Sequence, residues 1–274
     1  MNEENANLNQ ENTAEWQAPP PPIDPAPPAE PPRMSEAATL GNIFISPGET
    51  FEDLRRKPRF ILAILLMMIL TGTFSFLFTQ KMGEARMKSF ALEQMEKNPQ
   101  MASMTAEQKE RAVETNHTIA GYTNLLIPVF LLIFFAIGGL VYWLAGKAMG
   151  GSGNYWHGLS TWVYSSLPPT LVAMLANLLI LLLKSADEID IATSQRGLVH
   201  ANPSFFIDGK SSPVLATLLG TLDFFQIWGW ILAAIGLQKV MKLSASSAWA
   251  IVLILALVSL AFRIVMAYFS GNPT

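Results

Sequence analysis

Residues 125–145 read LLIPVFLLIFFAIGGLVYWLA, a long run without a single charged side chain. A helix rises about 1.5 Å per residue, so about 20 apolar residues cross the hydrocarbon core of a bilayer. Four further runs are comparably long and apolar, too long for ordinary strands, and they cover residues 60–78, 159–183, 215–237 and 248–269. The sequence therefore predicts an all-α, polytopic membrane protein with five transmembrane helices in a bundle.

The overall composition limits the classes of function. Hydrophobic residues make up 51% of the chain and charged residues only 14%, with a formal net charge of -3. Proteins that bind nucleic acid present a basic face, so no nucleic-acid partner is expected. The chain has no cysteine, which excludes a disulfide scaffold, a thiolate zinc site and a cysteine nucleophile.

The chain divides into three regions. Residues 1–40 are polar and then proline-rich, with APPPPIDPAPPAEPP at residues 18–32, and they predict a disordered cytoplasmic tail with local polyproline II character. Such a tail is either a ligand for a protein partner or a plain spacer, and the spacer is the commoner case. Residues 41–59 predict an interfacial amphipathic helix, and residues 60–269 form the transmembrane domain.

The segment before the first span carries helix signals. Ser46, Pro47 and Glu49 form a capping-box start, and Phe51 and Leu54 share one apolar face. The helix is expected to lie on the membrane surface and to end in a basic cluster that contacts lipid headgroups, formed by Arg55, Arg56, Lys57 and Arg59. The alternative is an orientation signal alone, and the two are compatible.

This basic cluster also predicts the orientation, because cytoplasmic connections are enriched in Lys and Arg. It places the N-terminus in the cytoplasm and, with five spans, the C-terminus outside. The short connections at residues 146–158 and 239–246 also carry lysines and fall on the cytoplasmic side. The connections at residues 79–124 and 184–214 then lie outside, and Thr105 with Gln108 predicts a capped helix in the first of them.

A search for catalytic chemistry finds no candidate. His117, His157 and His200 lie in separate connections without the spacing of metal ligands. Gly146-Lys147 lacks the remainder of a phosphate-binding loop, and no serine occupies a nucleophile elbow. The sequence therefore indicates no catalytic, cofactor-binding or metal-binding residue, and no cofactor.

Polar residues inside the predicted spans are the remaining candidates, since an ionisable group at membrane depth suggests a functional site. Asp223 and Gln226 lie in the fourth span and Arg263 in the fifth. An antiparallel pairing of these spans would bring Asp223 and Arg263 to similar depth, so an ion pair between them is the favoured hypothesis. The alternatives are a lone hydrogen-bonded Asp223 beside a snorkelling Arg263, and a proton relay, which would need further ionisable groups.

Pro168 and Pro169 lie inside the third span, after Ser165 and Ser166. Proline removes a helical hydrogen bond, and nearby hydroxyls can satisfy the freed carbonyls. We expect a kink here, which either lines a cavity for lipid or substrate or only shapes packing.

Several of these stretches together resemble the Yip (Ypt-interacting protein) family of multi-pass membrane proteins in its bacterial form. The resemblance covers residues 41–269 and is carried by IFISPGETFEDLRRKP, GGSGNYWHGLSTWVYSSLP and LDFFQIWGWILAAIGL in that order. It implies five spans, a cytoplasmic N-terminus and a bacterial inner membrane. Eukaryotic relatives associate with Rab-type GTPases, but this chain has no matching contact motif, so GTPase binding is not carried over.

The sequence thus predicts a non-enzymatic integral membrane protein that organises membrane or binds a partner, as in trafficking. Its expected partners are membrane lipids and a protein that binds the N-terminal tail. The alternative is a small-solute or ion transporter or channel that uses Asp223 and Gln226.

Overall fold

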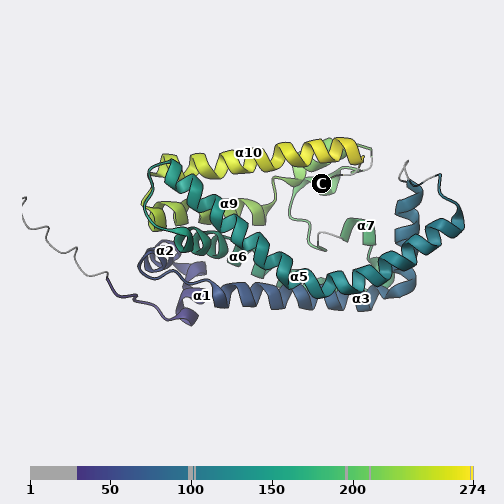
Figure 1. The fold of residues 1–274 in the computed structure, drawn as a ribbon, viewed down its shortest axis with the longest axis horizontal. Coiled ribbons are helices and arrows are strands. Elements are labelled where there is room, and N and C mark those ends of the chain that lie inside the picture. Colours follow the sequence, from purple (N-terminus) through teal and green to yellow (C-terminus); the bar gives the residue numbers. More distant parts are fainter. Residues whose placement is uncertain are drawn as a thin grey trace, which may run out of the picture. The chain divides into compact units, whose positions relative to one another are not determined.

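The computed structural model describes residues 30–97, 101, 103–194, 197–209, 211–271 and 273, which form helices joined by turns and loops (Figure 1). None of these residues forms a strand, so the predicted all-α class is confirmed. Of the tail predicted for residues 1–40, residues 1–29 lie outside the described residues.

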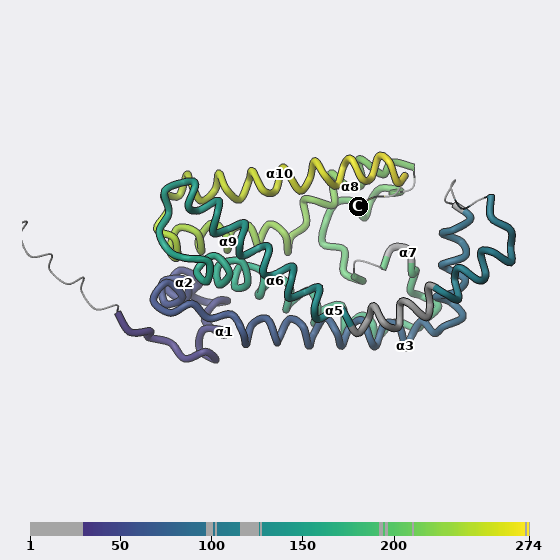
Figure 2. Tube along the Cα trace, in the orientation of Figure 1, coloured from purple at the N-terminus to yellow at the C-terminus, as the bar shows by residue number. Residues whose placement is uncertain are grey.

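In the described part of the chain, five helices are long and apolar enough to cross a membrane, which confirms the predicted number of spans. They are α3 (Ile61–Lys97), α5 (Ala106–Ala148), α6 (Tyr155–Leu183), α9 (Phe224–Met241) and α10 (Ala245–Ser270). Helix α6 packs against α5, α3 and α9, and α9 packs against α10 (Figure 2). The fourth span is shorter than the predicted 215–237, because a separate helix, α8 (Pro213–Gly220), precedes α9.

Between residue 30 and the first span the structure has two short helices instead of the one predicted. Helix α1 (Glu36–Ile45) starts inside the segment predicted to be disordered, and the side chain of Ser35 caps it by accepting from the Ala38 N–H at 3.1 Å. Helix α2 (Pro47–Arg56) has proline at its first position as predicted. The predicted capping box does not form, because Ser46 has φ −132° and ψ 65° and its side chain makes no capping hydrogen bond.

Helix α2 belongs to the core of the bundle. Phe51 and Leu54 are fully buried, and α2 packs against α9 and α6. A side chain at Gly236 of α9 would collide with the Phe51 ring, 2.8 Å from the position of its Cβ. The prediction of a helix whose apolar face meets lipid is therefore corrected, since protein covers that face.

Helices α5 and α6 are in very close contact. A Cβ at Gly158 would lie 2.5 Å from the carbonyl oxygen of Gly139, and a Cβ at Gly139 would lie 2.7 Å from the Cα of Leu159. Small residues allow helix backbones to approach in this way, which replaces the hydrophobic driving force that is lacking between helices in lipid. This contact fixes the position of α6 and of the residues that it carries.

Helices α3 and α5 continue beyond the length that a bilayer needs, since the 43 residues of α5 correspond to about 64 Å. Thr105 and Gln108 form the predicted capping box at its start. Gly83, with φ 72° and ψ 157°, breaks α3 into two helical parts. Near this break, Lys81 and Arg86 donate to carbonyls at and after the end of α6, so the two helices are joined there.

The connection between α6 and α9 contains the short helices η1 (Ala186–Glu188), α7 (Ile191–Ser194) and η2 (Pro203–Phe206), followed by α8. The buried Asn177 of α6 accepts hydrogen bonds from the N–H groups of Leu198 and Val199 at 2.6 and 2.9 Å. The Asn177 side chain thus fastens this connection to α6, in addition to the contacts of Lys81 and Arg86 with its first residues. Phe205 and Phe206 of η2 are exposed.

Glu188 has a lowered pKa, because the backbone N–H and the hydroxyl of Ser185 donate to its carboxylate at 2.7 and 3.0 Å. A lowered pKa in the folded state means that the turn is stabilised above the pKa of the unfolded chain and loses this contribution as the pH falls through the folded value. We expect hydrogen exchange of the Ser185 amide, corrected for intrinsic rates, to accelerate below that pH. In Glu188→Gln the acceleration should disappear; an unchanged pH profile would contradict the assignment.

Candidate functional site

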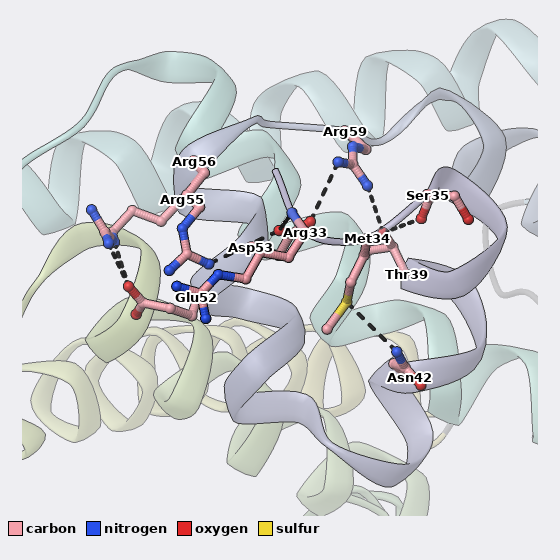
Figure 3. A network of polar contacts seen from close by, with 10 residues as sticks. All are labelled: Arg33, Met34, Ser35, Thr39, Asn42, Glu52, Asp53, Arg55, Arg56 and Arg59. Carbon is pink, nitrogen blue, oxygen red and sulfur yellow. Dashed lines mark hydrogen bonds and ion pairs between the residues drawn. The ribbon is translucent and has the colours of Figure 1, made fainter. Parts of the chain in front are cut away.

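A cluster of charged residues is buried where α1, α2 and the start of α3 meet (Figure 3). Its centre is Asp53 of α2, with 1% of its surface exposed, and Arg59, with 8%. Nη2 of Arg59 lies 3.3 Å from Oδ2 of Asp53, and Nη1 donates to the Thr39 hydroxyl of α1 at 2.8 Å. Pro58 ends the helical segment, so the chain returns and Arg59 reaches back to Asp53.

Two further groups approach the same carboxylate. The backbone N–H of Arg33 donates to Oδ1 of Asp53, and Nη1 of Arg56 lies 4.0 Å from this oxygen. Oδ2 of Asp53 accepts no well-aligned hydrogen bond from the described residues, although it is within ion-pair distance of Arg59. Charge attraction therefore offsets much of the cost of burying this oxygen. The cluster ties the chain at residue 33, α1, α2 and the entry to α3 together.

The structure corrects the predicted role of the basic residues as a set of lipid contacts. Arg59 is buried in the cluster, and Arg56 is nearly as buried beside Asp53. Arg55 pairs with Glu52 on the surface of α2, while its backbone carbonyl lies 3.1 Å from Nε2 of His157. Lys57 is exposed, and headgroup contact stays a prediction for this residue.

Asp223 has a different environment from the one predicted. It lies at the N-terminus of α9 as the cap residue, and its Oδ1 accepts from the N–H groups of Phe225 at 2.9 Å and Gln226 at 3.4 Å. Oδ2 accepts from the side-chain amide of Asn202 at 3.0 Å. The ion pairs and hydrogen bonds between described residues include none that joins Asp223 to Arg263. Asp223 therefore ties α9 to the preceding connection, and it lies at a helix start because capping satisfies the first free N–H groups.

The capping role leads to a prediction for two substitutions. Asp223→Ala should lower the free energy of unfolding by about 1 kcal/mol, the usual value of an N-cap side chain. Asp223→Asn should stay within a few tenths, because asparagine is an equally good cap. Thermal unfolding in detergent measures both changes. Equal losses of unfolding free energy in the two variants would mean that the negative charge of Asp223, and not its capping hydrogen bonds, stabilises the protein.

Gln226 and Pro169 do come together, which the sequence did not show. Both line a cavity of about 420 Å³ between α5, α6, α9 and α10. Helix α6 continues through Pro168 and Pro169 without a break. The hydroxyls of Ser165 and Ser166 donate to the Trp162 carbonyl, both at 2.9 Å, whereas the prolines free the carbonyls of Tyr164 and Ser165. The residues around the cavity are Tyr142, Trp162, Ser165, Ser166, Pro169, Thr170, Ala173, Met174, Phe225, Gln226, Gly229, Trp230, Val252, Leu255, Ala256 and Ser259.

Sequence reasoning missed the centre of the buried cluster. Sequence reasoning assigns no role to Asp53 and predicts a lipid contact for Arg59. A signal was present, because Thr50 and Asp53 share a helical face with Leu54 and Asp53 precedes Arg56 by three residues. This spacing shows that Asp53 and Arg56 can form an ion pair, but only the tertiary fold shows that the carboxylate is buried.

Comparison with known proteins agrees with this architecture. The family profile of the Yip1 domain matches residues 41–267. The chain is 29% identical over 241 residues to the membrane protein YknW of Bacillus subtilis (strain 168), covering 86% of this chain and 91% of that protein. No solved structure matches the chain. The matched range includes Asp53 and Arg59 of the buried cluster, the residues that line the cavity, the first four candidate spans and most of the fifth, and the chain therefore belongs to the Yip1 family of multi-pass integral membrane proteins.

Proposed function

We propose that this protein is a non-enzymatic membrane protein that organises its surroundings by binding a protein partner through its N-terminal tail. The observation that carries the proposal is the hydrogen bond from the Arg33 N–H to the buried Asp53. It holds the chain directly after the proline-rich segment against the folded domain.

The chemistry of residues 18–32 indicates the kind of partner. A polyproline II segment loses little entropy when it binds, and protein domains recognise it with grooves lined by aromatic side chains. The positive residues before the first span support a cytoplasmic position for the tail.

Site-specific photo-crosslinking in living cells tests the proposal. A photoreactive amino acid replaces Pro27 in one variant and exposed Lys57 in a second. We expect a discrete protein adduct from position 27 that disappears when residues 18–32 are exchanged for a glycine-serine sequence of equal length. The Lys57 variant reports whether the exchanged protein still inserts. An adduct that survives the exchange would show that the tail is a spacer.

Transport is the second candidate, because Gln226 lines a cavity within the spans and Asp223 starts the same helix. A transporter that moves protons or cations through Asp223 needs an ionisable carboxylate. In proteoliposomes, Asp223→Asn would then abolish ion flux or its pH dependence while the cap and the fold stay intact. Flux equal to that of empty liposomes in the unmodified protein would eliminate this candidate.

A further inference from the structure

The cavity between α5, α6, α9 and α10 has the size and shape of a ligand site. Its volume of about 420 Å³ lies within the range of small-molecule pockets in proteins. On α6 its lining extends from Trp162 to Met174, which corresponds to about 18 Å along a helix. The cavity is therefore long relative to its volume, and it suits an extended molecule.

One wall of the cavity offers a backbone acceptor. The Ser165 carbonyl would normally accept from the N–H of residue 169 or, in a tighter turn, of residue 168. Both positions are proline and have no N–H. The Ser165 carbonyl oxygen lies opposite Gly229 of α9, 3.7 Å from where a Cβ would be. A buried carbonyl of this kind is stabilised by any donor that reaches it.

Two polar side chains lie on the other walls. Gln226 is one helical turn before Gly229 in α9, and Ser259 belongs to α10. Neither side chain makes a hydrogen bond to another residue in the described part of the chain. The Gln226 amide can both donate and accept, and the Ser259 hydroxyl can do the same. The three groups give the cavity a hydrogen-bonding capacity for a ligand.

The charge and polarity of the remaining lining restrict the ligand further. Among the described residues that surround the cavity there is no Asp, Glu, Lys or Arg. A charged ligand group would lose its hydration here without an ionic partner, which is costly. Most of the other walls are apolar, including Met174, Val252 and Leu255. The surroundings therefore favour a molecule with an uncharged polar head and an alkyl chain.

We propose that this cavity binds a single-chain, uncharged amphiphile whose hydroxyl or amide head bonds to the Ser165 carbonyl and the Gln226 amide. The alkyl chain lies along the apolar walls of α6 and α10. This site is independent of the tail-mediated function proposed above. In this proposal Pro168 and Pro169 have a role, because they leave the Ser165 carbonyl available to accept a hydrogen bond from the ligand.

Photolabelling of the full chain in lipid nanodiscs tests the proposal. The probe is a monoacylglycerol with a diazirine in its acyl chain. We expect saturable labelling of cavity residues on α6, α9 and α10. Gly229→Leu places a side chain in the cavity where no atom is closer than 3.7 Å to its Cβ, and should reduce saturable labelling about tenfold, equivalent to about 1.4 kcal/mol.

Gly72→Leu is the matched control, because Gly72 lies in α3 and has no atom within 4 Å of the corresponding Cβ. Its labelling should equal that of the unmodified protein. Labelling that does not saturate, or that Gly229→Leu leaves unchanged, would overturn the proposal by showing ordinary contact with bulk lipid. Circular dichroism and size-exclusion profiles establish that each variant is folded.

Competition separates the possible sources of the ligand. Unlabelled monoacylglycerol should displace the probe, whereas an ionised fatty acid, an anionic phospholipid and free glycerol should not. Displacement by the anions would overturn the proposed selection for an uncharged head. Displacement by glycerol at the same concentration would overturn the amphiphile and indicate a small-solute site.

Gln226→Leu provides a second variant if Gly229→Leu does not fold, because the Gln226 side chain has no hydrogen bond to another described residue. It should weaken the binding of monoacylglycerol several-fold, as expected for the loss of a hydrogen bond worth about 1 kcal/mol. Labelling by a diazirine alkane without a head group should stay constant. Equal effects on both probes would contradict head-group recognition by Gln226.

Discussion

Replacing Arg59 by methionine should destabilise the protein by about 3–5 kcal/mol, the range for removing one partner of a buried ion pair. Methionine retains much of the side-chain volume of arginine, but it leaves the Asp53 carboxylate charged and buried. Among the described residues, the remaining ion pair of this carboxylate is then the one with Arg56, whose Nη1 lies 4.0 Å from Oδ1. Thermal or denaturant unfolding in detergent, followed by circular dichroism, measures the loss.

Two further variants decide whether the pair is the cause. Lys57→Met removes an exposed cation two residues away, and its effect should stay within about 0.5 kcal/mol. The double variant Asp53→Leu with Arg59→Met should recover most of the lost stability, because an apolar pair can replace a buried ion pair with little cost. An Arg59→Met protein as stable as Lys57→Met would contradict the assigned role of the cluster.

Gly158→Ala should lower the free energy of unfolding by about 2 kcal/mol, a typical cost of overpacking. The new Cβ would be 2.5 Å from the Gly139 carbonyl oxygen and 2.8 Å from the backbone nitrogen of Trp143, so α5 and α6 must separate. Side-chain rotation cannot relieve this collision, because the colliding atoms belong to the backbone. The midpoint of thermal unfolding in detergent reports the effect.

Gly72→Ala is the comparison that isolates packing from helix propensity. Gly72 also lies inside a helix, but its Cβ position has no neighbour within 4 Å. Alanine should therefore be neutral or stabilise the helix by up to about 1 kcal/mol, the difference in intrinsic propensity. If both substitutions had the same effect, the close approach of α5 and α6 would not contribute to stability.

The membrane spans could be predicted because their signal is local. A run such as residues 125–145 has only one low-energy solution in lipid, a helix that satisfies its own backbone hydrogen bonds. The fourth span was predicted too long because hydropathy does not register the turn at Thr221. Asp223 before the apolar run of α9 is a capping signal. The residues on both sides of it are apolar, so the mean hydropathy of the segment stays high and hides the helix start.

The role of α2 could not be predicted from its pattern. An amphipathic helix shows the same apolar face whether lipid or protein covers it, so Phe51 and Leu54 identify a buried face without identifying its neighbour. The same limit applies to Arg59, because a cation before a span looks the same in the sequence whether it contacts lipid headgroups or forms an internal ion pair. The partner residues, Asp53 and Thr39, lie 6 and 20 positions away from it, and folding brings them together.

The bond between Arg33 and Asp53 uses a backbone N–H and no side chain. Every amino acid except proline supplies this group, so proline at position 33 would remove this hydrogen bond. Proline is abundant immediately before this position, and position 33 is where that composition has to stop.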